Sequence, residues 1–533
     1  MDINLFLLIF GLLIVGCILT SKISTRFSMP CLMFFLLVGL ALQWIGDLGA
    51  QDTVKTISDG LSWQTANYFG TVALAFILFS GGYDSSLKDI KKVLVPGTIL
   101  STVGVLLTAL LLGGFACVTM HGYQDDGRAK FIACCLLFGA IISSTDASAV
   151  FSILRSKKIS LKGDLRPLLE YESGSNDPMA TLLTLFFLGM YEGLVSGESS
   201  LTSSMLWFIP SFVWQMAAGV GFGILLAKAA IWLFNRIKLD YDGLYHVLGM
   251  GVVITTYAIA SQCKANGFMA VYVAGIVMGN SEYVFKNSFG RYSDALAWLM
   301  QVILFTMLGF KANINVLTEP KFALSGLLFG LFLMFIARPV ATFLCLFKSK
   351  YSTKAKTLIS WVGLRGGAPI MLATFPMVSN VEWGELNGVG FNELMFNMIF
   401  FMVLLSVAFQ SFTIMPLARL LKLDSPLQEV PTAPLSFDQV TYKKEKKGAG
   451  ADDDDYADNR TAEFTVQDTS GLVDKELKDL GLPNGVFVLM VRRNTKYIVP
   501  RGNTVIHAND SLTVLGTAER LKEATEFFSG PKA

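Results

Sequence analysis

The sequence predicts a polytopic all-α membrane domain of about thirteen transmembrane helices, followed by a small α+β domain on the cytoplasmic side. Of the 533 residues, 53% are hydrophobic and only 16% are charged, whereas soluble domains carry roughly 25% charged residues. Apolar runs of about 20 residues, long enough to cross a bilayer, recur through residues 1–420. Residues 424–533 carry a net charge of −4, against +6 for the residues before them. This composition excludes a disordered chain, a collagen-like fibre and a disulfide-bonded scaffold.

Each apolar run is expected to form one membrane helix. The runs lie near residues 3–20, 30–46, 63–82, 94–118, 131–154, 166–190, 205–234, 244–262, 266–281, 295–310, 322–347, 355–378 and 391–420. The loops after odd-numbered runs hold 18 Lys and Arg residues, whereas the loops after even-numbered runs hold 6. Because cytoplasmic loops are rich in Lys and Arg, we expect the N-terminus outside the cell and the C-terminal domain in the cytoplasm.

Ionisable residues inside membrane spans are costly and usually serve function. The sixth run is the richest in them. Helical geometry places residues i and i+4 on one face, so Ser173 and Asp177 share a face, while Glu172 and Asn176 share a second face. A desolvated carboxylate that also meets cations can hold either a proton or a metal ion. This competition predicts a proton-coupled cation exchanger; the alternative is that Asp177 only forms a packing salt bridge with Arg365.

The fifth and twelfth runs are interrupted near their middle by small and polar residues. The interruptions are Ser143–Ser148, which contains Asp146, and Gly363–Pro369, which contains Arg365. Transporters built from inverted repeats place broken helices at corresponding positions of their two halves. An odd offset of seven spans makes the two runs antiparallel, as an inverted repeat requires. The charged residues can neutralise helix termini exposed there; the alternative is close helix packing through small residues.

Three motifs together resemble those of the monovalent cation:proton antiporters of the NhaP type. They are Thr145-Asp146, the run Glu172–Asp177 and Gly363–Gly366. The resemblance extends over nearly all of residues 1–420 and includes the thirteen-span layout. In this family an Asn-Asp pair accompanies electroneutral exchange. The resemblance therefore implies a secondary antiporter that exchanges one monovalent cation, potassium or sodium, for one proton by alternating access.

The same resemblance implies roles for individual residues. Asp177 would bind the cation and the proton in turn, and Asn176 would be the structural amide beside it. Thr145 and Asp146 would lie at the crossing of the unwound helices and supply a backbone carbonyl and a carboxylate to the ion. Ser173 would complete the shell of oxygen ligands.

Two further positions are structural expectations. Glu172 would pair with Arg365 and hold the sixth span against the twelfth. The family usually has proline after the Thr-Asp pair, where this chain has Ala147. The substitution removes one local reason for unwinding, although nearby serines can satisfy freed backbone groups.

Residues 424–459 are predicted to be a flexible charged linker. This segment combines Pro426, Pro431 and Pro434 with the lysine-rich run 443–447 and four aspartates at 452–455. Opposed charge blocks without apolar periodicity are typical of disorder. The lysines are either solvated or in contact with anionic lipid headgroups.

Residues 460–533 are predicted to fold as a small α+β domain. Expected strands are 464–466, 486–491, 497–499 and 511–515, and expected helices are 472–480 and 518–528. Pro500–Thr504 and Asn509–Leu512 resemble the C-terminal lobe of RCK regulators, also called TrkA-C. The resemblance implies a dimeric regulatory lobe without the nucleotide-binding N-lobe.

The basic side chains of this lobe allow two interpretations. Arg492, Arg493 and Arg501 either form a solvated basic face or contact the phosphates of a nucleotide ligand. Related lobes govern potassium transport, which favours potassium over sodium by association only.

Other functional classes are less well supported. The alternative of an RCK-regulated cation channel requires a carbonyl-lined filter, and no Thr-Val-Gly-Tyr-Gly-like run occurs. An enzyme is not expected, because His121, His246 and His507 are scattered. We expect no cofactor and no nucleic-acid partner. The expected partners are the lipid bilayer of the inner or plasma membrane, potassium or sodium, protons and a second copy of the chain.

Overall fold

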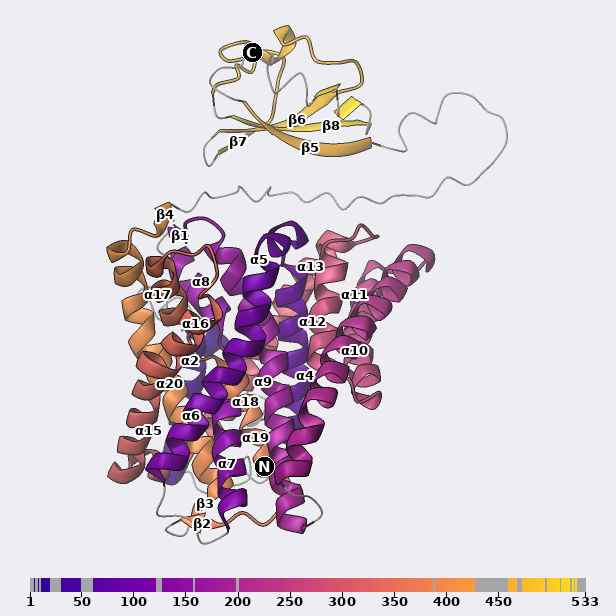
Figure 1. Cartoon of the computed structure of the whole chain (residues 1–533). Coiled ribbons are helices and arrows are strands. Elements are labelled where there is room, and N and C mark those ends of the chain that lie inside the picture. Colours follow the sequence, from indigo (N-terminus) through magenta and orange to yellow (C-terminus); the bar gives the residue numbers. More distant parts are fainter. Residues whose placement is uncertain are drawn as a thin grey trace. The chain divides into compact units, whose positions relative to one another are not determined.

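The computed structural model divides the chain into two compact units, residues 1–434 and residues 435–533. Each unit is described by itself (Figure 1). The structure describes Asn4, Leu8 and residues 11–19, 30–48, 61–120, 127–156, 159–197, 201–386, 389–426, 459–466, 472–493, 496–508, 510–517, 520–521 and 523–524. Most of the linker expected at 424–459 and most of the helix expected at 518–528 therefore lie outside the described residues.

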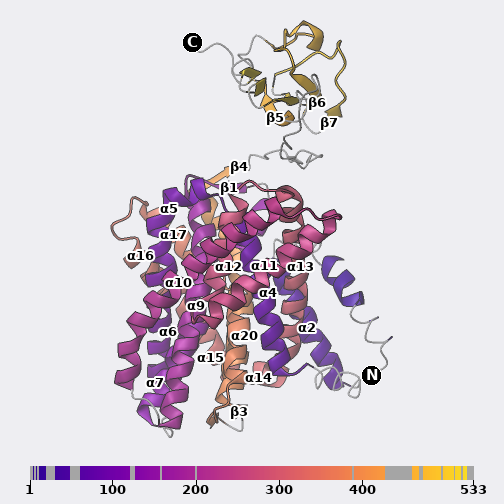
Figure 2. The same cartoon turned by 90° about the vertical axis from the view of Figure 1, so that its right-hand side faces the viewer.

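The first unit is a bundle of helices (Figures 1 and 2). Residues 11–19 are helical. The further helices are α2 (Cys31–Leu48), α4 (Trp63–Tyr83), α5 (Leu87–Ile99), α6 (Val105–Thr119), α7 (Arg128–Ile141), α8 (Ala147–Ser156), α9 (Leu165–Ser196), α10 (Leu201–Arg236), α11 (Asp242–Gln262), α12 (Gly267–Gly279), α13 (Lys286–Lys311), α14 (Ile314–Thr318), α15 (Pro320–Phe332), α16 (Arg338–Cys345), α17 (Thr353–Trp361), α18 (Gly367–Leu372), α19 (Thr374–Val378) and α20 (Phe391–Leu420). One-turn π-helical segments, η1 (Leu100–Gly104) and η2 (Leu333–Ala337), join α5 to α6 and α15 to α16.

Local sequence accounts for several helix starts. Ser62, Asn266 and Ser352 precede α4, α12 and α17, and each side chain accepts a hydrogen bond from a backbone N–H of the first turn. Such caps satisfy donors that a helix N-terminus leaves without an internal partner. Pro320 is the first residue of α15, where its missing N–H is no loss. The helix boundaries therefore follow capping chemistry as well as hydropathy.

Eight described helical segments are long and apolar enough to cross a membrane. This number is smaller than the expected thirteen. The fifth and twelfth runs are each divided into shorter helices, and the second and ninth runs form apolar helices that are too short. The first run lies partly outside the described residues. Three further apolar helical segments are shorter, at Cys31–Trp44, Gly267–Gly279 and Gly367–Val378. The protein is thus a multi-pass membrane protein.

The helices pack in two groups. Helices α2, α4, α12 and α13 pack mainly against one another, with α10 and α11 beside α12. The second group contains α5–α9 and α15–α20. Close approach within the first group depends on small residues: a Cβ at Gly309 would lie 2.2 Å from the Leu36 backbone oxygen, and one at Gly39 would lie 2.1 Å from that of Thr306. Glycine at both positions lets α2 and α13 touch backbone to backbone.

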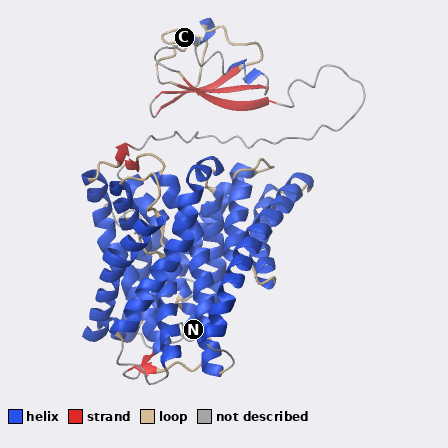
Figure 3. Ribbon diagram, in the orientation of Figure 1, coloured by secondary structure: helices blue, strands red, loops and turns tan. Residues whose placement is uncertain are grey.

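Two short antiparallel ribbons lie at opposite ends of this unit (Figure 3). At one end, β1 (Ile159–Leu161) pairs with β4 (Asp424–Pro426), and Ser160 lies opposite Ser425. At the other end, β2 (Glu385–Leu386) pairs with β3 (Val389–Gly390). The expectation that the linker begins at 424 is wrong for its first three residues, because they belong to β4.

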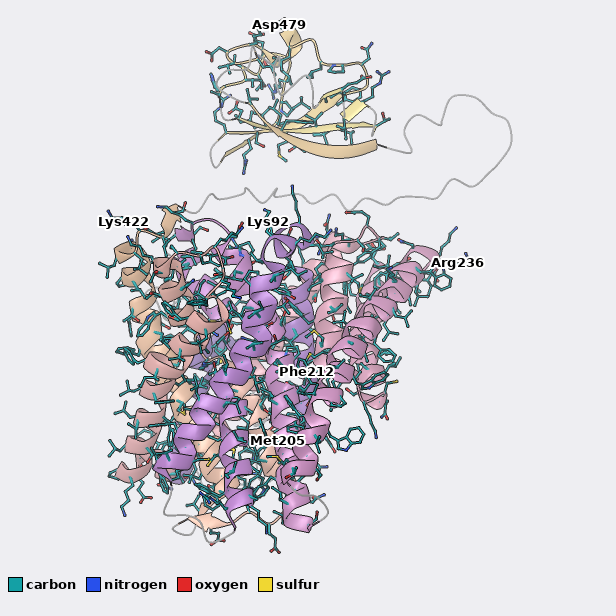
Figure 4. All side chains as sticks on the ribbon, viewed as in Figure 1. Lys92, Met205, Phe212, Arg236, Lys422 and Asp479 are labelled. Carbon is teal, nitrogen blue, oxygen red and sulfur yellow. The ribbon has the colours of Figure 1, made fainter. Side chains whose placement is uncertain are left out.

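The basic side chains at the ends of three helices share one end of the bundle. Figure 4 shows Lys92, Arg236 and Lys422 at that end. Met205 and Phe212 lie along α10 on the outer surface. The three basic residues follow the third, seventh and thirteenth predicted spans. The segments after these odd-numbered spans therefore lie at the same end of the bundle.

The second unit contains a four-stranded antiparallel sheet in the order β5-β8-β6-β7. Its strands are β5 (Asn459–Thr465), β6 (Phe487–Arg493), β7 (Lys496–Ile498) and β8 (Ser511–Thr517). The four strands expected from the sequence correspond to these elements. The core contains Val466, Val491, Leu512 and Val514, all fully buried.

The helix predicted at 472–480 is wrong. In its place, Glu476 forms an isolated bridge with Val505, and Leu477–Asp479 is a short 3₁₀ helix. The backbone N–H groups of Asp474 and Leu477 donate to the carbonyls of Ile506 and Thr504. Pairing with residues 502–506 therefore replaces internal helical hydrogen bonds, and tertiary contacts override an amphipathic pattern.

Candidate functional site: a cavity between two unwound helix segments

Two non-helical segments cross inside the first unit. One, residues 142–146, separates α7 from α8, and the other, residues 362–366, separates α17 from α18. The Asp146 backbone N–H donates to the Leu364 carbonyl over 2.8 Å. Each segment thereby satisfies part of the other's backbone, which is necessary because water cannot do so in a membrane.

Arg365 binds the end of α7. Its Nη1 atom donates to the backbone carbonyls of Ser143 and Ser144 at 2.6 Å each, and its side chain is 1% exposed. Its backbone N–H donates to Ser406 Oγ on α20. Carbonyls at a helix C-terminus lack internal partners and carry partial negative charge, so the guanidinium neutralises this helix end.

Asp146 directly precedes α8, so that its carboxylate lies at the N-terminus of that helix as the Arg365 guanidinium lies at the C-terminal end of α7. Its Oδ1 atom accepts a hydrogen bond from the Ala149 N–H at 3.3 Å. The carboxylate also lies against Gly366, where an added Cβ would come within 2.4 Å of Oδ2. Gly366 therefore has to be small for Asp146 to reach the crossing, which is a physical reason for glycine in the Gly-Leu-Arg-Gly sequence.

Helix α9 holds the crossing through two side chains. Ser173 Oγ donates to the Thr145 carbonyl at 2.7 Å and accepts from the Ala147 N–H at 2.8 Å. Asn176 Nδ2 donates to Thr145 Oγ1 at 2.6 Å. Ser173 and Asn176 were expected on separate faces, yet both reach Thr145. Ala147 contributes an N–H that a proline at this position would lack.

The expected pairing of Glu172 with Arg365 is wrong. Glu172 instead forms a buried ion pair with Arg338 of α16, and the two side chains are 1% and 3% exposed. The guanidinium of Arg365 is engaged by the α7 carbonyls, so it does not supply the bond to Glu172. Glu172 therefore holds α9 against α16 through Arg338, whereas the resemblance implied Arg365 as its partner.

Asp177 lies in a cavity of about 50 Å³ at this crossing. The cavity is also lined by Ser144, Thr145 and Asp146, with the backbone turn at Gly366 and Gly367 on one side. Among the described residues, neither Asp177 Oδ1 nor Ser144 Oγ has a hydrogen-bond partner. A buried oxygen without a hydrogen-bond partner destabilises the protein. These two oxygens are therefore available to bind a ligand, such as an ion, a proton or water, that enters the cavity.

One face of α9 leads to this cavity. Arg166 and Glu170 have side-chain exposures of 43% and 37% and form an ion pair at 2.9 Å. Ser173 and Asp177 follow on the same face and are partly exposed, whereas Thr184, two turns beyond Asp177, is fully buried. On this face of α9, the exposed fraction therefore falls from the end that follows β1 toward Thr184.

Two cavity residues were missed by sequence reasoning. Ser144 was seen only as part of a polar interruption, and Gln301 of α13 was not considered because it carries no charge. A search for uncharged polar residues inside predicted spans would have found Gln301. Among the described residues, no group of three His, Cys, Asp or Glu side chains could hold a metal ion.

The fold and this crossing define a cation/proton antiporter, and comparison with known proteins agrees. Residues 9–420 match the sodium/hydrogen exchanger transmembrane family, and residues 461–529 match the TrkA-C domain. The chain belongs to the sodium/hydrogen exchanger family and carries a C-terminal TrkA-C domain.

Individual relatives extend the comparison. The chain is 33% identical to the K(+)/H(+) antiporter NhaP of Alkalimonas amylolytica, over 96% of this chain and 81% of that protein. It is 32% identical to the K(+)/H(+) antiporter NhaP2 of Shewanella baltica strain OS223, over 99% and 84% of the two chains. It is 29% identical to the Na(+)/H(+) antiporter NhaP of Pseudomonas aeruginosa, over 67% of this chain and 81% of that protein.

A solved structure shares the fold. The sodium proton antiporter MjNhaP1 from Methanocaldococcus jannaschii at pH 8 superposes with a TM-score of 0.64 and 24% sequence identity. The match covers 79% of this chain and all of the other.

Proposed function

We propose that the protein exchanges potassium for protons by alternating access, with one cation and one proton competing for Asp177. The observation that carries the proposal is the Asp177 carboxylate, whose Oδ1 atom has no hydrogen-bond partner among the described residues and borders a cavity at the helix crossing. A proton or a cation can neutralise this carboxylate. Because both loaded forms are then nearly neutral, either can pass through a membrane-embedded transition, and exchange is electroneutral at one to one.

The other site residues support this exchange in different ways. Asp146 and the Thr145 carbonyl provide further oxygens, while Ser173 and Asn176 hold that segment against α9. Arg365 secures the α7 terminus, and the ion pair of Glu172 secures α9. Ser173 already makes two hydrogen bonds, so its main role in this arrangement is structural, with one lone pair left for the ion.

Potassium is favoured over sodium because the relatives named as potassium antiporters match a larger share of this chain. The two named K(+)/H(+) antiporters match over 96% and 99% of this chain, which includes the TrkA-C domain. The relative named Na(+)/H(+) antiporter matches over 67%. A cation channel is not favoured, because residues 9–420 match an exchanger family.

The architecture we propose has thirteen spans, with the fifth and twelfth as discontinuous helices of an inverted repeat. The end of the bundle that contains Lys92, Arg236 and Lys422 faces the cytoplasm of the cell (Figure 4). The path along α9 then opens to the cytoplasm. The protein is a homodimer in the inner or plasma membrane. Residues 427–458 are the linker, and residues 459–533 form a regulatory lobe.

The proposal is tested with purified protein in liposomes that contain a pH-sensitive dye. Potassium, sodium, lithium and rubidium salts are added in turn, and proton movement is recorded. We expect the largest proton flux with potassium and none with Asp177→Asn. Glu170→Gln is the matched control, because it removes a carboxylate two turns away on the same helix but outside the cavity. Cation-driven proton flux in Asp177→Asn would contradict the site assignment.

A further inference from the structure

The cavity at Asp177 has two chemically different walls. One wall consists of the unwound segments and α9 and contains the polar residues described above. The other wall comes from α2, α4 and α13, and its residues are Leu32, Leu74, Ile77, Gln301, Leu304 and Phe305. Among these described residues, Gln301 is the one polar side chain, and it lies within the apolar stretch of α13.

Within the described part of the chain, the amide of Gln301 makes no hydrogen bond. Gln301 is partly exposed, and its side chain lines the same cavity as Asp177 and Ser144. An uncharged polar side chain that faces such a cavity from an apolar helix, and that no hydrogen bond among the described residues holds in place, is available to a ligand that enters the cavity.

The polar wall alone offers few open oxygens. The Thr145 carbonyl already accepts from Ser173, and Thr145 Oγ1 accepts from Asn176. Arg365 covers the carbonyls of Ser143 and Ser144. A cation at Asp177 therefore meets the carboxylates of Asp177 and Asp146 and the Ser144 hydroxyl, while the Thr145 carbonyl keeps one lone pair. A neutral oxygen that accepts no hydrogen bond from the described residues has to come from elsewhere in the cavity.

A neutral amide oxygen bears directly on which cation is preferred. Discrimination between potassium and sodium in proteins depends on cavity size and on the number and field strength of coordinating oxygen dipoles. An additional carbonyl oxygen raises the coordination number without adding charge. Such a ligand favours the larger and more weakly hydrated ion, whereas a further carboxylate, in addition to those of Asp177 and Asp146, would favour the smaller ion through its stronger field.

We propose that Gln301 binds the transported cation through its amide oxygen and thereby favours potassium over sodium. This inference rests on the proposed exchange at Asp177. Gln301 is then a ligand contributed by the helix group that contains α2, α4 and α13, opposite the group that carries the two aspartates. A purely structural amide, or one that only donates its N–H to Asp177, would not distinguish between cations.

The test measures the concentration of each cation that gives half-maximal proton flux in liposomes. Replacement of Gln301 by leucine, Gln301→Leu, is expected to raise this concentration about tenfold for potassium, the change that corresponds to a loss of about 1.4 kcal/mol of binding. The change for sodium should be smaller, so the half-maximal concentration for sodium divided by that for potassium should fall. Gln301→Glu keeps an oxygen at the same reach and should retain high affinity while the preference for potassium is lost.

The control is Leu299→Met, on the same helix but exposed on the outer surface rather than in the cavity. It should leave all half-maximal concentrations within about twofold. A second readout does not need transport: salt-dependent thermal stabilisation of the purified protein reports binding to the folded state. Potassium should stabilise the wild type more than sodium does, and Gln301→Leu should remove that difference.

The outcomes separate this inference from the proposed function. Unchanged half-maximal concentrations in Gln301→Leu would overturn it, as would an equal shift for every cation. Absence of cation-driven proton flux and of potassium-dependent stabilisation in the wild type would instead reject the exchange at Asp177 itself.

Discussion

At the scale of single residues, the buried ion pair between Glu172 and Arg338 is the clearest structural determinant around the site. Both side chains are almost fully buried, and the pair links α9, which carries Asp177, to α16. Removal of one partner leaves a buried charge without compensation, which typically destabilises a protein by about 3–5 kcal/mol. The geometry of α9, and with it the position of Asp177, therefore depends on a residue outside the cavity.

A double-mutant cycle tests which arginine is the partner. We expect strong coupling between Glu172→Gln and Arg338→Gln, on the order of 2 kcal/mol, in thermal unfolding of the purified protein. The coupling between Glu172→Gln and Arg365→Gln should be clearly weaker, because Arg365 binds backbone carbonyls. Stronger coupling to Arg365 would restore the pairing that the motif resemblance implies.

A second residue-scale prediction concerns the TrkA-C domain. Asp510 is 1% exposed and accepts two hydrogen bonds from Arg493, at 2.9 and 2.8 Å. Burial would raise the pKa of the Asp510 carboxyl, but Arg493 and the His507 N–H outweigh it, and the pKa lies below its ordinary value of 3.8. Because the folded-state pKa is depressed, the stabilisation is complete above pH 3.8 and is lost as the pH falls through the folded-state value.

Hydrogen exchange of the full-length protein measures this contribution. Asp510→Asn should destabilise the domain by about 2 kcal/mol, a typical value for hydrogen bonds to a charged group. The amides of β6 and β8 should then exchange about thirtyfold faster at neutral pH. The difference from the wild type should shrink below pH 3.8, and a difference that grows with acidity would contradict the assigned pKa shift.

Sequence reasoning succeeded best where chemistry is local. Glu172 and Asp177 were identified because charges inside an apolar run are rare, and Asn176 because it precedes Asp177 and shares a helix face with Glu172. The structure brings Asp177 to the cavity with Asp146. The partner of Glu172 could not be found in this way, since Arg338 and Arg365 are both arginines in apolar runs. Gln301 was missed because an uncharged amide barely changes hydropathy.

At the scale of elements, the ribbon of β1 and β4 connects two parts of the chain that the sequence separates widely. Ile159 and Leu161 of β1 are buried, and the Lys162 N–H donates to the Leu423 carbonyl at 2.9 Å. Because β1 lies between α8 and α9, the chain that leaves α20 is attached to the connection between the elements that carry Asp146 and Asp177. A run of three residues is too short for a periodic pattern, so this strand could not be predicted.

Cysteine cross-linking tests the register of this ribbon. Ser160 and Ser425 are directly opposite, and such Cα atoms in antiparallel pairs lie roughly 4.5–5.5 Å apart, within the range for disulfides. Ser160→Cys with Ser425→Cys should therefore form a disulfide on mild oxidation, seen as a mobility change that reductant reverses.

The control pair for this experiment is Ser160→Cys with Ser379→Cys. Ser379 is the residue directly after α19, and α19 lies far from the ribbon of β1 and β4 (Figure 1). This control pair should give no cross-link. In every variant the exposed native Cys263 is replaced, so that it cannot form a disulfide itself. A cross-link in the control pair but not in the ribbon pair would show that the strands do not pair as described.

The unwound segments illustrate what pattern reasoning can and cannot predict about elements. Ser-Ser-Thr-Asp and Gly-Leu-Arg-Gly stood out as breaks in apolar runs, and these residues are non-helical in the structure. Their contact through the Asp146 N–H and the Leu364 carbonyl depends on pairing between distant residues. The helix wrongly expected at 472–480 failed for the related reason that distant backbone groups were better partners than local ones.

At the scale of the whole molecule, composition and charge predicted most of the organisation. The apolar body corresponds to an exchanger domain and the acidic tail to a TrkA-C domain. The excess of basic residues after odd-numbered spans corresponds to Lys92, Arg236 and Lys422 at one end of the bundle (Figure 4). Hydropathy could not predict that the second and ninth spans would form helices too short to be recognised by length.

The central claim is that Asp177 alone exchanges one cation for one proton. The most direct test is potassium-driven proton flux in liposomes at membrane potentials imposed independently of the potassium gradient. Because both loaded forms of the site carry nearly the same charge, we predict a flux that is independent of the potential and a transport ratio of one potassium ion to one proton. A flux that accelerates strongly with the potential, or a ratio that departs from one, would contradict the claim.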